Sequence, residues 1–116
     1  MGTVEFNWRH KKIIDETLVL IASKCKKLKS ITLKSCAEIK SEAFSLFFQQ
    51  TFAFTSINIA QNFDIKDDAL LAIALNHAKS LVSLNINGLD ELTSDSVNRV
   101  AKECTKIVDI DVSWVR

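Results

Sequence analysis

Apolar and polar residues alternate in short stretches that recur along the chain at a nearly constant spacing. Each full copy has apolar residues at its first, fourth and sixth positions, and Val4 with Phe6 forms the centre of a truncated copy. The full copies cover residues 28–36, 54–62, 81–89 and 107–115. The fourth positions are 27, 26, 27 and 26 residues apart, at Val4, Ile31, Ile57, Leu84 and Ile110. This alternation predicts strands near residues 4–6, 30–34, 56–60, 83–87 and 109–113. It also predicts that the sixth positions, Leu33, Ile59, Ile86 and Val112, stack as one interior row.

The segments between these copies have the pattern of amphipathic helices. After an Asp or Ser and a following acidic residue, apolar residues occur at positions i, i+3 and i+4, as in Leu18, Ile21 and Ala22. The Asp or Ser suits a helix N-cap, and the acid suits the positive end of the helix dipole. The predicted N-cap residues are Asp15, Ser41, Asp67 and Ser94.

One strand and one helix in every 26–27 residues predict a solenoid. Because the inward residues of one unit cannot be buried alone, neighbouring units must stack. We therefore predict a single α/β domain over residues 1–116, in which about four repeats form a horseshoe arc with parallel strands on the concave face and α-helices on the convex face. The lack of proline and the presence of only two glycines agree with turns of a repeated geometry. An ordinary α/β domain with coincidental periodicity is the alternative.

The sequence of residues 13–36, IIDETLVLIASKCKKLKSITLKSC, resembles one repeat of the cysteine-containing class of leucine-rich repeats. This class occurs in F-box/leucine-rich-repeat proteins, where each repeat has one cysteine near the helix end and another after the strand. In this chain the first position holds Cys25, Thr51, Ala78 and Cys104, and the second holds Cys36, Asn62, Leu89 and Val115. The resemblance implies recognition of a protein, as in the substrate receptors of cullin-based ubiquitin ligases, although no F-box precedes these repeats.

Composition and motifs give no indication of catalysis or of a bound metal or cofactor. The chain has 47% hydrophobic residues and a net charge of +1, so we expect neither nucleic acid nor a membrane as a partner. Since no phosphate-binding loop or metal-ligand spacing is present, we expect no catalytic, metal-binding or cofactor-binding residues and no small-molecule substrate. Cys25, Cys36 and Cys104 are predicted to be unpaired and largely buried. The N-terminus lacks the apolar core of a signal peptide, so we expect a cytoplasmic protein, with nuclear or cytoskeletal locations open.

Small polar residues on the strands predict a protein-binding surface on the concave sheet face. Alternation directs the third, fifth and seventh positions of each copy to this face. The predicted binding residues are Thr32, Lys34, Asn58, Asn85, Asn87, Asp109 and Asp111. The other positions on this face are Ser30, Ser56, Ala60, Ser83 and Ser113. A solvated sheet face without a partner fits the same residues equally well. Trp8 and Trp114 are candidate aromatic anchors, or they pack on a neighbouring loop.

These observations predict a non-enzymatic protein–protein interaction module that resembles the substrate-recognition repeats of F-box/leucine-rich-repeat ubiquitin ligase adaptors. The alternative is a structural subunit, or scaffold, of a large ciliary, cytoskeletal or organellar assembly. A solenoid usually needs polar capping repeats, and the sequence leaves no room for one before Val4 or after Val112. We therefore expect a protein partner, a second copy or further sequence to cover one or both ends.

Overall fold

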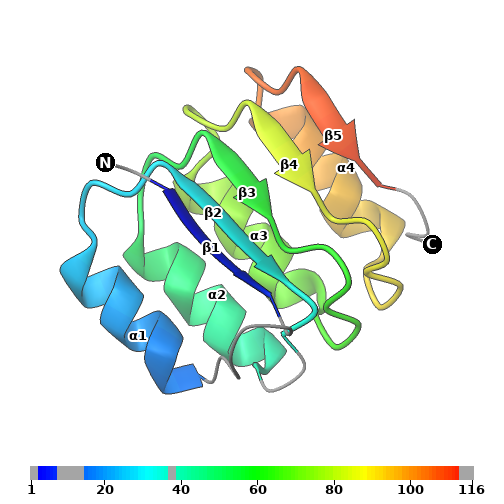
Figure 1. Ribbon diagram of the computed structural model, residues 1–116. Coiled ribbons are helices and arrows are strands. Elements are labelled where there is room, and N and C mark those ends of the chain that lie inside the picture. The colour runs from blue at the N-terminus through cyan, green and yellow to red at the C-terminus, as the bar shows by residue number, and fades with distance from the viewer. Residues whose placement is uncertain (1–2, 8–14, 37–38, 113–116) are drawn as a thin grey trace.

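Strands and helices alternate regularly in the computed structural model, which describes residues 3–7, 15–36 and 39–112 (Figure 1). The strands are β1 (Thr3–Asn7), β2 (Ser30–Lys34), β3 (Ser56–Asn58), β4 (Ser83–Asn85) and β5 (Asp109–Asp111). The helices are α1 (Asp15–Lys24), α2 (Ser41–Gln50), α3 (Asp67–Asn76) and α4 (Ser94–Glu103).

The five strands form one parallel sheet in the order β1-β2-β3-β4-β5, and the helices cover one face of it (Figure 1). The strand register places equivalent positions of successive repeats side by side: Val4, Ile31, Ile57, Leu84 and Ile110. Each repeat therefore contributes one strand to the open face and one helix to the covered face. This arrangement confirms the predicted α/β repeat fold.

The middle strands are shorter than predicted because asparagine side chains end them. The Asn58 Oδ1 atom accepts a hydrogen bond from the backbone N–H of Ala60 at 3.1 Å. The Asn85 Oδ1 atom accepts one from the N–H of Asn87 at 2.9 Å. Such local bonds replace ladder bonds, so β3 ends at Asn58 and β4 at Asn85 instead of at residues 60 and 87. In β2, which has Thr32 at this position, the strand continues to Lys34.

A left-handed residue makes the corner after three of the strands. Ser35, Gln61 and Gly88 have φ angles of 56°, 64° and 81° and lie at equivalent places in their repeats. Only one of these residues is glycine. A Cβ atom on Gly88 would come within 3.3 Å of the Gln61 side chain, and its φ angle disfavours any other residue. The chain thus repeats one corner geometry, as its low glycine content indicates.

The predicted N-caps do not cap their own helices. The residues before α2, α3 and α4 are Lys40, Lys66 and Thr93, and none of them makes a side-chain cap bond. Instead, the first residue of a helix accepts a hydrogen bond from the N-cap backbone N–H of the next repeat. These bonds join Asp15 Oδ1 to Lys40 N (3.2 Å), Ser41 Oγ to Lys66 N (2.9 Å) and Asp67 Oδ1 to Thr93 N (2.9 Å). The N-cap prediction was wrong because these short side chains reach the neighbouring repeat.

The core between sheet and helices is built from equivalent apolar positions of successive repeats. Leu33, Ile59 and Ile86 are fully buried, as predicted for an interior row of side chains. Val112, the fourth member of this predicted row, is 39% exposed, and Ile110 is 38% exposed. The row prediction is wrong at Val112 because no further repeat stacks on β5 within the part of the chain that the structure describes.

All three cysteines are unpaired, but only two of them are buried. Burial raises the pKa of the Cys36 thiol to about 11, and burial together with the nearby Glu103 carboxylate raises that of Cys104. Cys25 is exposed, which contradicts its predicted burial. It follows α1 and lines an open notch between two loops.

Candidate interaction surfaces

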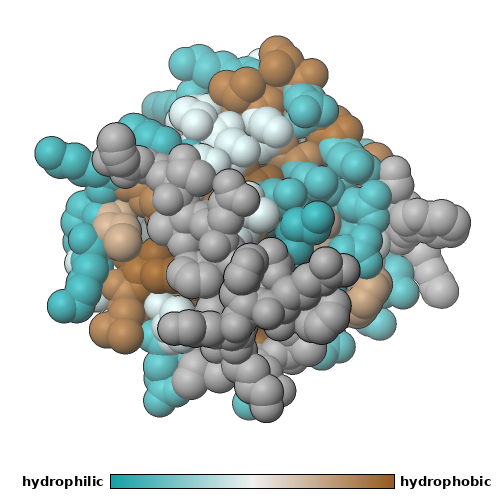
Figure 2. All heavy atoms as spheres, viewed as in Figure 1, coloured by the Kyte–Doolittle hydropathy of each residue, from teal (hydrophilic) through white to brown (hydrophobic). Residues whose placement is uncertain are grey.

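The open face of the sheet brings four of the predicted binding residues into one row. Thr32, Asn58, Asn85 and Asp111 are register partners on β2, β3, β4 and β5. All four are half-buried, so their side chains are accessible at the surface of a well-packed sheet. Figure 2 shows hydrophilic residues over the part of this face where β4 and β5 end. We call these four residues the polar row.

In each asparagine of the polar row, the side-chain oxygen is hydrogen-bonded within the protein and the side-chain NH₂ group is available to a partner. Their Oδ1 atoms are held by the backbone of Ala60 and Asn87, as described above. Their Nδ2 groups donate no hydrogen bond to any described residue, and both side chains are partly exposed. Because the bonded oxygens fix the rotamers, the two amide groups are pre-oriented donors for an acceptor on a partner.

The remaining predicted residues lie outside this row. Lys34 is exposed at the last position of β2, and Asp109 is exposed at the first position of β5, so they lie at opposite ends of the strands. Asn87 follows β4, and its Oδ1 atom accepts a hydrogen bond from Gln61 Nε2 at 3.0 Å. Ala60, assigned to the open face by alternation, is buried because the chain turns after Asn58.

Three further residues of the predicted surface are not described. Trp8 and Trp114, the candidate aromatic anchors, lie outside the described residues, as does Ser113.

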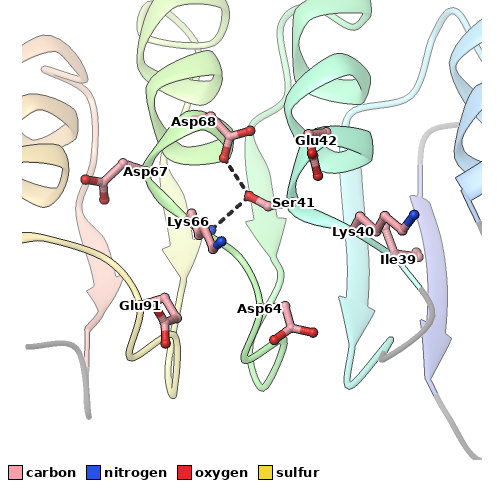
Figure 3. Close-up of a pocket in the computed structure, with 9 residues that line it drawn as sticks. All are labelled: Ile39, Lys40, Ser41, Glu42, Asp64, Lys66, Asp67, Asp68 and Glu91. Carbon is pink, nitrogen blue, oxygen red and sulfur yellow. Dashed lines mark hydrogen bonds between the residues drawn. The ribbon is translucent and has the colours of Figure 1, made fainter.

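A groove of about 640 Å³ runs along the edge where the strands end and the helices begin (Figure 3). Its carboxylates are Glu42, Asp64, Asp67, Asp68 and Glu91, and its cations are Lys40 and Lys66. The Ser41 hydroxyl at its centre donates to Asp68 at 2.5 Å and accepts from the Lys66 N–H at 2.9 Å. The described residues contain no cluster of three potential metal ligands. The sequence feature that could have predicted this groove is the acidic residue near the start of each helix.

The carboxylate of Asp67 joins the last two described helices at this edge. It accepts hydrogen bonds from Thr93 Oγ1 and Ser96 Oγ, both at 2.6 Å, besides the Thr93 backbone bond. Burial acts to raise the pKa of Asp67, but these hydrogen bonds outweigh it and lower the pKa below its ordinary value. Asp67 is therefore a structural link, and its carboxylate is largely used within the protein.

His77 is a buried residue whose role the sequence analysis missed. Its backbone N–H bonds to the carbonyl of Ile73, as those of Cys25 and Cys104 bond to the carbonyls four residues before them. His77 therefore occupies the position after the helix that the repeat alignment assigned to Ala78. The alignment was wrong here because the extra residue of this 27-residue repeat lies after α3.

The imidazole of His77 is held between backbone groups of the preceding repeat. Its Nδ1 atom accepts from the Phe54 N–H at 3.2 Å, and its Nε2 atom lies 3.1 Å from the Phe48 carbonyl oxygen. An accepting Nδ1 and a carbonyl at Nε2 require the neutral tautomer with its proton on Nε2. The ring also packs against Phe48 and Phe54, and burial lowers the pKa of His77 to about 4.

We expect this histidine to make the free energy of unfolding fall as the pH falls. The pKa of His77 is about 4 in the folded state and 6.5 ordinarily. Between these two pH values, His77 is therefore protonated in the unfolded chain but neutral in the folded protein. The contribution of His77 to the free energy of unfolding should therefore be fully present above pH 6.5. It should decrease by about 2–3 kcal/mol as the pH falls towards 4. Urea unfolding at several pH values measures this slope. A His77→Gln variant should lack it, and an equal slope in that variant would contradict the prediction.

Comparison with known proteins supports the same fold. No family model matches the chain. The chain is 31% identical over 107 residues to the DNA repair protein RAD7 of Saccharomyces cerevisiae, and the match covers 90% of this chain and 18% of RAD7. In the crystal structure of yeast Rad7 in complex with Elc1, one chain resembles this protein with a TM-score of 0.78 and 25% identity. That likeness covers 89% of this chain and 27% of the other. The chain thus corresponds to a minor part of the length of these relatives.

No helix of the described residues has the length and apolar character needed to cross a membrane. The in-register repeats of one strand and one helix, together with the likeness to Rad7 in sequence and in structure, show an α/β repeat fold and support its similarity to the leucine-rich repeats.

Proposed function

We propose that the chain is a non-enzymatic protein-interaction module that binds a partner polypeptide on the open sheet face. The polar row carries this proposal, because it aligns four polar residues on a face backed by a fully packed core. In the proposed complex, the amide groups of Asn58 and Asn85 at the centre of the row donate hydrogen bonds to the partner. Asp111 adds a carboxylate at one end of the row. Rigid, pre-oriented groups of this kind bind with a small loss of conformational entropy.

The proposal extends to the class of process. The structure of yeast Rad7 was determined as a complex with Elc1, which supports a protein partner for this repeat domain as well. With the resemblance to the cysteine-containing repeats, we propose that the module selects a protein substrate for a ubiquitin ligase. In this role the polar row contacts the substrate, and the chemistry belongs to other subunits.

A double variant, Asn58→Asp with Asn85→Asp, tests the polar row. Each aspartate retains an oxygen for the N–H of Ala60 or Asn87, so the melting temperature should change little. Each also replaces an outward donor with an acceptor, and we expect partner binding to weaken about tenfold or more. Affinity capture from native extract, with quantitative mass spectrometry, measures the loss.

A matched control makes the same two amide-to-acid changes on the helices. Gln49 and Asn98 are exposed on α2 and α4, so Gln49→Glu with Asn98→Asp alters the net charge equally. This control should retain its partners. Equal retention by the control and by the polar-row variant would show that the open face does not bind the partner.

The last described repeat, on which no further repeat stacks, favours a second function. In this function the chain is a structural subunit that is held by its partner at this repeat. Ile110 and Val112 are each exposed by more than a third of their surface, whereas their counterparts in the middle repeats are fully buried. A stable complex held there should dissociate with Ile110→Thr and Val112→Thr but persist with the polar-row variant. Size-exclusion chromatography of native extract distinguishes the two functions, since a receptor should show the opposite sensitivity.

A further inference from the structure

A notch of about 200 Å³ opens at the edge of the molecule where helices end and strands begin. It lies between the α1–β2 loop, which contains Cys25, and the α2–β3 loop, which contains Phe52. Ala22, Leu28 and Phe54 give it an apolar lining. This notch lies away from the polar row, because it is formed by loops at the start of the strands.

Phe52 is an aromatic residue that the repeat does not require. It is 64% exposed, whereas Phe54, two residues later, is fully buried in the aromatic cluster of the core. The equivalent residues after the other three helices are Lys26, Ala78 and Thr105, which are polar or small. Large apolar side chains exposed on a rim of a groove are typical of interaction sites.

The backbone beside Phe52 is also unusual for its repeat position. Ala53 has a φ angle of 67°, in the left-handed region that costs a residue with a Cβ atom about 1–2 kcal/mol. The residues at the equivalent loop positions, Lys27, Lys79 and Lys106, do not have a positive φ angle. The left-handed turn separates the exposed Phe52 from the buried Phe54. The loop therefore keeps a strained conformation that leaves an aromatic ring at the surface.

Exposed lysines without acidic neighbours in the sequence gather at the end of α1 and in the α1–β2 loop, which forms one wall of the notch. The side chains of Lys24, Lys26, Lys27 and Lys29 are all exposed. Residues 23–36 and 49–56, which include both loops of the notch, contain no aspartate or glutamate. Among the described residues the one salt bridge joins Arg99 to Glu103, so none of these lysines is neutralised by an ion pair there. The acids of α1, Asp15 and Glu16, lie at its opposite end. Lys26 thus lines the apolar notch, and Lys24, Lys27 and Lys29 add positive charge to the segment that forms this wall.

We propose that this notch binds an acidic segment of a partner protein, which inserts one apolar side chain against Phe52. The lysines attract the carboxylates of the segment, and the apolar lining accepts the side chain between them. A peptide fits better than nucleic acid, because a strand of nucleotides needs a longer basic track with several stacking aromatic rings. The notch offers one exposed ring and a short cluster of charge.

The test uses two fluorescein-labelled synthetic peptides of aspartate and glutamate, one with a central leucine and one with a central serine. Fluorescence anisotropy with the whole chain should show about tenfold tighter binding of the leucine peptide, as expected for one buried apolar anchor. Phe52→Ser should remove this preference. Lys26→Glu with Lys27→Glu should weaken both peptides about tenfold or more, and added salt should act in the same direction.

Matched controls separate the notch from general electrostatics. Lys79→Glu with Lys106→Glu makes the same charge change in the loops after α3 and α4 and should bind both peptides nearly as the unaltered chain does. Phe63→Ser removes another exposed phenylalanine, at the opposite edge of the sheet, and should keep the leucine preference. The polar-row variant should also keep it, so this test can fail or succeed independently of the proposed function.

Cys25 provides a second readout in the unaltered protein. It lines the notch and is exposed, whereas Cys36 and Cys104 are buried. The leucine peptide should slow alkylation of Cys25 by iodoacetamide, as followed by mass spectrometry. Equal affinity for the two peptides, or no protection of Cys25, would overturn the proposal. A single-stranded oligonucleotide that binds as tightly as the leucine peptide, with no effect of Phe52→Ser, would assign the lysines to nucleic acid instead.

Discussion

Replacement of Ile59 by Asp is expected to abolish folding. Ile59, like Leu33 and Ile86 of the neighbouring repeats, is fully buried, and no lysine or arginine among the described residues is buried with it to pair with a carboxylate. Burying an unpaired charge and losing the apolar side chain should together cost more than about 5 kcal/mol, comparable with the whole stability of a domain of this size. Circular dichroism and urea unfolding should show no cooperative transition.

The neighbouring residue provides the control. Asn58→Asp introduces the same side chain one position earlier in the same segment, but on the open face, where the carboxylate is solvated. This variant should fold with nearly the stability of the unaltered chain. A soluble Ile59→Asp protein that melts cooperatively near the temperature of the control would show that the inward and outward positions have been assigned to the wrong faces.

The second large effect is expected at Asn62, a buried polar residue between β3 and α3. Its Nδ2 group donates to the carbonyl oxygens of Leu33 and Ile59, both at 2.7 Å, and to that of Ala60 at 3.2 Å. Its Oδ1 atom accepts from the Cys36 N–H at 2.7 Å. Asn62→Ala would leave these backbone groups buried without partners. We expect a loss of about 3–5 kcal/mol in the free energy of unfolding, measured by urea denaturation.

Asn62→Leu distinguishes hydrogen bonding from packing at this position. Leucine occupies the equivalent place in the next repeat, at Leu89, where it is fully buried. If the hydrogen bonds of Asn62 stabilise the corner, the leucine variant should lose about as much stability as the alanine variant. Recovery of most of the stability by leucine would mean that this position needs only volume.

The repeat register could be predicted from the sequence because it depends on buried side chains. Ile31, Ile57 and Leu84 recur at nearly equal intervals, and only one register buries all of them on the same face. The order of the strands follows from this register. The open-face positions Thr32, Asn58 and Asn85 follow from it as well, since side chains alternate along a strand.

The details that sequence reasoning missed depend on polar contacts between repeats. A pattern of residue types cannot show that Asn58 ends its strand by bonding to its own backbone, or that Asp67 reaches the next helix. The position of His77 was missed because an inserted residue can lie anywhere between two aligned strands. Asn62 was identified only as the counterpart of Cys36, although a buried amide among apolar equivalents is a recognisable signal of backbone hydrogen bonding.

The bonds from the first residue of one helix to the start of the next have a consequence for how this architecture changes in length. Asp15, Ser41 and Asp67 each contact a backbone N–H about one repeat later in the chain, and no side-chain identity at the receiving position is needed. Removal of residues 41–66 would join Lys40 directly to Asp67 and would preserve both the receiving group for Asp15 and the helix that follows it. Whole repeats are therefore interchangeable modules, which can be gained or lost by duplication or deletion in phase without redesign of their junctions.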